Sequence, residues 1–289
     1  MRILILGDSL PFPRPHKGQP VDVTWPELIK AQMPDADVWL RATPRSCILD
    51  VIKEFFFFTD SLPDFDVMIV ETGIVDCAPR PYPRWIYKFL ETFLGMNGLR
   101  KIERFSHDHL LWLHGRPWVG QNSFAKAIRQ LVETAHERNP AFTTLFVPIA
   151  PPTRTILQTL PGIDHAAAIY NGIIERETGA LSERFRCQCV QPFSDSDPFE
   201  VTIEDGHHLS ITGHRLIAGA LITALKTLKA SGITRPQSPT IPAIRNESAS
   251  FSAGNTWPKG ASTARSFSPA MAQPMAVTVL EQNQRPASR

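Results

Sequence analysis

The chain has 289 residues, and 43% of them are hydrophobic, so it is long and apolar enough to bury a sizeable core. Its 30 basic and 28 acidic residues are scattered along the sequence and leave a net charge of +2, so no charged stripe indicates nucleic acid as a partner. No apolar run approaches the roughly 20 residues that cross a bilayer, and the apolar start is too short for a secretory signal. We therefore expect a cytoplasmic protein without a membrane span, acting on a small molecule.

Short apolar runs predict the strands of a sheet. The first, at residues 2–6, is almost entirely apolar and ends in Gly-Asp-Ser, which is typical of a strand buried on both faces of a parallel sheet. Four later runs have the same character and are also bounded by polar or turn-forming residues. They cover residues 37–40, 66–71, 144–149 and 187–190.

Stretches between these runs predict helices. Residues 25–31 place a proline near a helix start, where its missing N–H costs little. Residues 123–138 repeat apolar side chains at helical spacing, with Asn122 as the expected N-cap, and residues 166–185 and 212–228 follow the same pattern. Because strands and helices alternate, we expect an α/β protein of three layers, in which helices cover both faces of a mostly parallel sheet.

Two regions depart from this alternation. Residues 77–121 form a long aromatic and basic insertion, with a helical run around residues 85–94. After about residue 232 the chain is rich in Pro, Ser, Thr and Ala and has no apolar periodicity, so we predict a disordered tail over residues 232–289. The folded domain is expected to span residues 1–231.

The four cysteines do not indicate a metal site. Cys47, Cys77, Cys187 and Cys189 form neither a CxxC pair nor a spaced Cys/His set, so a structural zinc ion is not expected. In a reducing compartment we interpret them as free thiols.

The first candidate for chemistry is Ser9. It directly follows the first buried strand, so its hydroxyl should emerge at the carboxyl end of the sheet, where open α/β folds place their sites. Taken alone, Gly7-Asp8-Ser9 is equally well explained as an ordinary turn, because all three residues favour turns and caps.

The second candidate is the segment Asp205-Gly206-His207-His208, just before the last predicted helix. An Asp and a His three residues apart in a loop can converge, so that the carboxylate orients the imidazole while the ring takes a proton from a serine. The alternative is that Ser210 or Thr212 caps the helix and the histidines are surface residues.

Together the two segments resemble the first and last sequence blocks of the SGNH/GDSL hydrolase superfamily. The first block is similar to Ile5-Leu6-Gly7-Asp8-Ser9-Leu10, and the last is similar to Asp205 to Ser210. The resemblance covers residues 1 to about 230 and implies a flavodoxin-like fold with Ser9 as nucleophile, His208 as base and Asp205 as its partner. It implies an acyl-enzyme mechanism that needs no metal or organic cofactor.

The third block of this superfamily normally reads Gly-x-Asn-Asp, and its asparagine donates a hydrogen bond to the oxyanion. Here the equivalent residues are Gly73-Ile74-Val75-Asp76, so Val75 replaces the asparagine and has no side-chain donor. Removing one such donor typically costs about 100- to 1000-fold in rate.

The second block normally supplies a glycine N–H to the same oxyanion, but Arg41 to Ser46 contains no glycine. A backbone N–H of Ser46 or Arg45 could point inward instead, because that donor does not depend on the side chain. The guanidinium of Arg45 or Arg80 could replace the missing donor or clamp an anionic substrate group, or it could form an ordinary ion pair.

The sequence therefore favours a serine esterase that removes an acyl group, with acetyl on a carbohydrate as the first hypothesis. Aromatic and basic residues of the insertion, such as Tyr82, Trp85 and Trp118, suit sugar rings or acyl groups, although they could equally pack as an aromatic subdomain. An O-acyltransferase of surface polysaccharide assembly and a non-catalytic binder on the same fold remain as alternatives. The sequence does not indicate an oligomeric state.

Overall fold

The computed structural model describes residues 1–59, 64–95, 98 and 115–231. Its centre is a sheet of five strands in the order β2-β1-β3-β4-β5, and every pair of neighbours is parallel. The strands are β1 (Arg2–Gly7), β2 (Asp37–Ala42), β3 (Val67–Glu71), β4 (Thr143–Val147) and β5 (Cys187–Cys189). The predicted mostly parallel sheet is thereby confirmed, because all five apolar runs became strands of one sheet.

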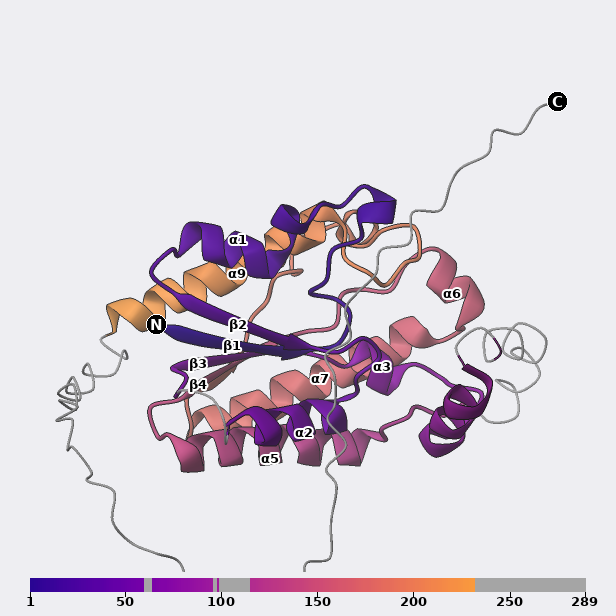
Figure 1. Ribbon diagram of the computed structural model, residues 1–289, viewed down its shortest axis with the longest axis horizontal. Helices are drawn as coiled ribbons and strands as arrows, with labels where there is room; N and C mark the ends of the chain where they lie inside the picture. The colour runs from indigo at the N-terminus through magenta and orange to yellow at the C-terminus, as the bar shows by residue number, and fades with distance from the viewer. Residues whose placement is uncertain (60–63, 96–97, 99–114, 232–289) are drawn as a thin grey trace, which may run out of the picture. The chain divides into compact units, whose positions relative to one another are not determined.

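Helices cover both faces of this sheet (Figure 1). The helices α1 (Trp25–Gln32) and α9 (Ile211–Ala230) pack together on one face, and α2 (Ile48–Thr59), α5 (Gln121–Arg138) and α7 (Ile163–Ser182) cover the other. The strands β3 and β4 are buried along their whole length, as continuous apolar runs between two helical layers require. The expected three-layer α/β/α architecture is confirmed.

The remaining elements are short and lie near the ends of the strands. They are the 3-10 turns η1 (Pro15–Lys17) and η2 (Val21–Val23) and the helices α3 (Ile74–Cys77), α6 (Thr155–Thr159) and α8 (Pro198–Val201). The insertion contributes a helical stretch over residues 84–95 and a bridge between Arg80 and Arg116. The helical run predicted around residues 85–94 is thus confirmed.

Two local predictions need correction, and one helix was missed. The helix α5 begins at Gln121 with Gly120 as its N-cap, so Asn122 lies inside the helix rather than capping it. The strand β4 ends at Val147, two residues before the end of the predicted run. The helix α2 was not predicted. Its buried face is formed by Ile48, Val51, Ile52 and Phe55, whereas Phe56 and Phe57 are exposed, so the run of phenylalanines hides the helical period in the sequence.

The strand order fixes the place where a ligand can enter. The chain runs from β1 outward to β2 and then crosses back to β3 on the other side of β1. The connections after β1 and β3 therefore diverge, which opens a crevice at the carboxyl ends of these two strands. Ser9 follows β1 and Gly73 follows β3, so both candidate segments begin at this crevice.

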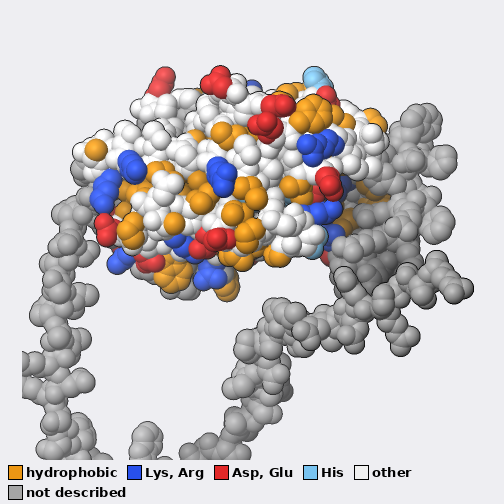
Figure 2. All heavy atoms as spheres, turned by 90° about the horizontal axis from the view of Figure 1, so that it is seen from above, with side chains coloured by type: hydrophobic (Ala, Val, Ile, Leu, Met, Phe, Trp, Pro, Cys, Tyr) orange, Lys and Arg blue, Asp and Glu red, His pale blue; other side chains and the backbone are white. Residues whose placement is uncertain are grey.

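The surface of the described part of the chain carries mixed charges. Figure 2 shows one face, on which basic, acidic and hydrophobic side chains are interspersed. Within the described ranges, no helix is both long and apolar enough to span a membrane. The predicted disordered tail, residues 232–289, lies outside the described residues.

Candidate active site

Ser9 is placed at the mouth of the crevice by the end of β1. Gly7, the last residue of the strand, has no room for a side chain, because a Cβ there would lie 2.6 Å from the carbonyl oxygen of Glu71. After the strand the chain turns at Asp8, whose carboxyl oxygen accepts the N–H of Leu10 at 2.9 Å. The half-buried Ser9 follows and lines an open pocket of about 860 Å³.

The loop that carries Asp205 and His208 is held from two sides. The N–H of Ile203 donates to the carbonyl of His208 at 2.9 Å, and the N–H of Thr153 donates to the carbonyl of Gly206 at 2.8 Å. Gly206 has φ +81°, and a Cβ there would overlap the carbonyl oxygen of Thr153. Only glycine therefore allows the loop to lie this close to the segment after β4.

Ser210 caps α9, since its Oγ accepts the N–H of Gly213 at 3.0 Å. The capping role considered from the sequence is therefore real. It does not compete with the position of the histidines, because the cap fixes where the helix begins while the preceding loop turns toward Ser9.

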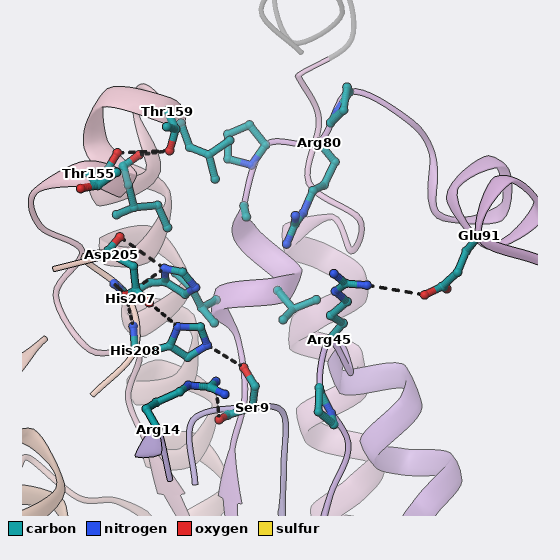
Figure 3. A pocket seen from close by; sticks show the side chains of 18 residues that line it. Ser9, Arg14, Arg45, Arg80, Glu91, Thr155, Thr159, Asp205, His207 and His208 are labelled. Carbon is teal, nitrogen blue, oxygen red and sulfur yellow. Dashed lines mark hydrogen bonds and ion pairs between the residues drawn. The ribbon is translucent and has the colours of Figure 1, made fainter. Parts of the chain in front are cut away.

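Ser9, His208 and Asp205 lie in line at the carboxyl end of the sheet (Figure 3). The Oγ of Ser9 lies 3.2 Å from Nε2 of His208, and Nδ1 of the same ring lies 2.7 Å from Oδ2 of Asp205. The other carboxylate oxygen accepts the backbone N–H groups of His207 and His208, at 3.1 and 3.0 Å. A proton on Nδ1 satisfies the carboxylate and leaves Nε2 as the acceptor for a serine proton.

The charges in this cluster favour that arrangement. Partial burial raises the pKa of Asp205, but hydrogen bonds from the side chain and backbone of His208 outweigh it, and the net pKa lies well below its usual range. Burial, together with the neighbouring His208, lowers the pKa of His207 to about 4. Asp205 is thus a carboxylate and His207 a neutral ring near pH 7.

No protein-family model matches this chain, and no curated protein is similar to it in sequence. Several solved structures are similar in fold. The lipase/acylhydrolase from Enterococcus faecalis gives a TM-score of 0.51 at 13% identity, over 78% of this chain and 96% of that one. A member of the lipolytic G-D-S-L family from Veillonella parvula DSM 2008 gives a TM-score of 0.51 at 12% sequence identity, over 78% of this chain and 98% of that one. The acetyl xylan esterase AlAXEase gives a TM-score of 0.50 at 13% sequence identity, over 78% of this chain and 100% of that one.

The chain has the fold of the lipolytic G-D-S-L proteins. The fold that the sequence resemblance implied is thereby confirmed. Because one fold can host many activities, the function of this chain is argued below from the geometry of its own site.

The segment from Gly73 to Asp76, which resembles the third block, follows β3. Gly73 takes φ +131° and starts α3, and a Cβ there would lie 2.7 Å from the side chain of Ile149. Gly73 is therefore needed for the turn that leads into α3. It is not among the described residues that line the pocket. Val75 does line the pocket, is only 6% exposed and presents an apolar side chain there.

The second-block segment corrects one expectation. The N–H of Ser46 donates to the carbonyl of Thr43 at 3.1 Å, and Ser46 does not line the pocket, so this N–H does not supply the missing oxyanion donor. Arg45 takes φ +68°, a left-handed conformation that glycine adopts at little cost. Arg45 therefore holds a backbone conformation that usually favours glycine.

Arginines dominate the charge around the pocket. Arg45 and Arg80, both anticipated from the sequence, line it, with Nη1 of Arg45 3.5 Å from Oε1 of Glu91. Arg14 was not anticipated, although it follows Ser9 by only five residues, and its Nη2 donates to the carbonyl of Ser9 at 3.2 Å. Burial lowers the pKa of Arg14, and the nearby carboxylates of Asp205 and Asp8 oppose that shift.

Buried carboxyl groups lie at and just beyond the carboxyl ends of β1 and β3. Burial raises the pKa of Asp8 to about 7, and burial together with the charge of Asp8 raises that of Glu71 well above its usual value. Glu71 accepts the indole N–H of Trp25 at 2.8 Å. Burial likewise raises the pKa of Asp76 to about 7, and its carboxyl accepts the N–H of Ile48 at 2.9 Å, which ties the third block to the start of α2.

One group of side chains has the composition of a metal site. The ligand atoms of Asp205, His207 and His208 lie within 4.8 Å of one another. Two of these residues are already joined by the 2.7 Å hydrogen bond between His208 Nδ1 and Asp205 Oδ2, so a metal ion would have to displace the proton between them. The arrangement suits proton transfer better than metal binding.

Proposed function

We propose that this chain is a serine esterase that cleaves an O-acyl ester through an acyl-enzyme. The observation that carries the proposal is the continuous chain of contacts from Ser9 Oγ to His208 Nε2, at 3.2 Å, and from His208 Nδ1 to Asp205, at 2.7 Å. The chain of contacts opens into a pocket at the position where α/β sheets bind ligands.

In the proposed reaction, His208 takes the proton of Ser9 as the serine oxygen attacks the ester carbonyl. Asp205 stabilises the imidazolium that results, because its own low pKa keeps it charged. The protonated His208 then gives its proton to the leaving alcohol, and an acyl group remains on Ser9. Water, deprotonated by the same ring, attacks this acyl group and releases a carboxylic acid and the free serine.

The oxyanion of the tetrahedral intermediate needs donors other than a side chain at position 75. We propose that backbone N–H groups next to Ser9 and the guanidinium groups of Arg45 and Arg80 supply them. Both arginines line the pocket together with Ser9, and Figure 3 shows Arg80 and Arg45 on the side opposite the histidines. Cations are suited to this task because they meet the charge that develops on the oxygen.

For the acyl group we propose acetyl, carried by a carbohydrate. One protein of the same fold is described as an acetyl xylan esterase, and a short acyl group suits a pocket wall formed by Val75 and Ile74. If an acceptor hydroxyl replaces water, the same acyl-enzyme gives O-acyl transfer.

A non-catalytic binder is the second candidate, and the apolar Val75 in the pocket is the observation that favours it. A fluorophosphonate probe separates the two functions. We expect the wild-type protein to be labelled at Ser9 and to release 4-nitrophenol from 4-nitrophenyl acetate. Ser9→Ala should abolish labelling and lower kcat/KM by about 10⁴-fold or more.

The matched control is Ser123→Ala, since Ser123 is exposed on α5 and does not line the pocket. It should keep both labelling and hydrolysis. A wild-type protein that is folded but resists the probe, under conditions that label a control esterase, would favour the binder. Transfer of acetyl to an added sugar, faster than hydrolysis, would identify a transferase.

A further inference from the structure

A second hollow, of about 740 Å³, lies beside the active-site pocket in the insertion and the neighbouring helix α2. Arg80 lines both hollows, so they meet at this side chain. We call the second hollow the cationic groove. The described residues that line it are Lys53, Arg80, Tyr82, Pro83, Arg84, Trp85, Lys88, Arg116, Pro117 and Trp118.

Among the described residues, the cations that line the groove outnumber the carboxylates that pair with them. Lys53 and Arg116 are exposed, and neither has an ion-pair partner within the described ranges. Arg84 forms an ion pair with Asp50, and Nζ of Lys88 lies 3.9 Å from Oδ1 of the same carboxylate. One carboxylate, that of Asp50, thus lies close to two cations, and Asp50 is not among the residues that line the groove.

Aromatic side chains line the groove, and one of them holds Arg80 in place. The guanidinium carbon of Arg80 lies 4.8 Å from the centre of the Trp118 ring, so the ring holds the side chain at the border of the two hollows. The indole N–H of Trp118 donates to the carbonyl of Tyr82 at 3.1 Å. Trp85 is 73% exposed, so most of its large aromatic side chain is open to solvent.

We propose that the cationic groove binds the acidic sugar units of the substrate, whose acyl ester then reaches Ser9 past Arg80. This inference rests on the proposed esterase function and names its substrate class, a saccharide ester that bears carboxylate or phosphate groups. Guanidinium and ammonium groups pair with such anions, and an exposed indole face suits the apolar face of a sugar ring. Figure 3 shows Arg80 extending toward the space between the histidines and Arg45. Its positive charge would therefore lie between the groove and the ester that Ser9 attacks.

An anionic lipid surface is the rival occupant, because Phe89 and Phe93 of the helix at residues 84–95 are 57% and 71% exposed. These two rings are not among the residues that line the groove. The cations and Trp85 line a hollow, and a hollow fits a saccharide chain better than the flat surface of a bilayer. The saccharide is therefore the occupant that the lining favours.

Binding to the full-length Ser9→Ala protein tests the proposal without requiring catalysis. We expect trigalacturonate to bind at least about 10-fold more tightly than neutral galactotriose, with an affinity that falls as salt rises. Lys53→Glu and Arg116→Glu should each weaken trigalacturonate binding by about 5-fold and together by about 20-fold. Lys226→Glu is the matched control, since Lys226 is exposed on α9, and it should leave binding unchanged. Mannose 6-phosphate against mannose distinguishes phosphate from carboxylate recognition.

A kinetic comparison separates this proposal from the esterase function. In the otherwise wild-type protein, the double reversal should lower kcat/KM for acetylated trigalacturonate by about 20-fold and leave that for 4-nitrophenyl acetate unchanged. Charge-dependent trigalacturonate binding without hydrolysis of any ester would support the groove and overturn the esterase. Hydrolysis of 4-nitrophenyl acetate, with equal affinity for the charged and neutral trisaccharides, would overturn the groove. Loss of binding to phosphatidylglycerol vesicles on reversal, with no saccharide binding in any variant, would assign the surface to lipid.

Discussion

Asp205→Asn is the sharpest test of how the proposed site works. In the wild-type protein one carboxylate oxygen of Asp205 faces Nδ1 of His208 at 2.7 Å, while the other accepts the backbone N–H groups of His207 and His208. An asparagine can keep the two backbone contacts with its carbonyl oxygen. Its NH₂ group then faces Nδ1, which must give up its proton and become an acceptor.

The consequence is a ring whose proton sits on Nε2, 3.2 Å from Ser9 Oγ. Such a ring cannot accept the serine proton, and it also loses the negative charge that stabilises the imidazolium. Loss of this arrangement costs about 10³- to 10⁴-fold in rate, or about 4–5.5 kcal/mol of transition-state stabilisation. The fold should be little affected, because Asp205 is about a third exposed and the backbone contacts persist.

The assay combines initial rates on 4-nitrophenyl acetate, the rate of fluorophosphonate labelling and a thermal unfolding curve. Rates of hydrolysis and labelling should fall together while Tm stays within a few degrees of the wild type. Asp195→Asn is the control, because Asp195 is exposed and does not line the pocket. A folded Asp205→Asn protein that keeps more than a tenth of the wild-type rate would refute the assigned role of the carboxylate.

Three other substitutions have distinct expected outcomes. Gly206→Ala should destabilise the fold by about 3 kcal/mol or more and lower activity, because its Cβ would overlap the carbonyl of Thr153 and its φ is +81°. Urea unfolding measures the loss of stability, and ester hydrolysis measures the loss of activity. Asp8→Asn should be about 2–4 kcal/mol more stable than the wild type at pH 8, with little difference near pH 4. The reason is that the buried acid, whose pKa is raised to about 7 in the fold, contributes stability below its unfolded pKa that is lost as the pH rises through 7. Val75→Asn places an amide donor in the pocket and should raise kcat by about 10-fold or more.

These outcomes can each be contradicted. A Gly206→Ala protein as stable as the wild type would mean that the loop lies farther from Thr153 than the structure places it. An Asp8→Asn protein whose added stability did not grow between pH 5 and pH 8 would mean that Asp8 titrates normally. Glu71→Gln is the companion variant, because burial and the charge of Asp8 raise the pKa of Glu71 well above its usual value. An unchanged or lower kcat for Val75→Asn would show that position 75 does not face the oxyanion.

The sequence by itself determined the strands, most of the long helices and the first residues of the site. Continuous apolar runs predicted all five strands, because a strand between two helical layers must be apolar on both faces. The Gly-Asp-Ser turn and the Asp205 to His208 segment could be recognised because their geometry depends on neighbours along the chain. Ser9 could therefore be singled out, and so could the residues proposed to assist it.

Only the tertiary structure decided which of these residues meet. Ser9 and His208 are 199 positions apart, and it is the order β2-β1-β3 that opens the crevice where they converge. The same packing placed Arg14 in the pocket near the carboxylate of Asp205, which no local pattern indicated. Periodicity reports the burial of each segment, but contacts between distant segments depend on how the layers pack, and that information is not carried by any one stretch of sequence.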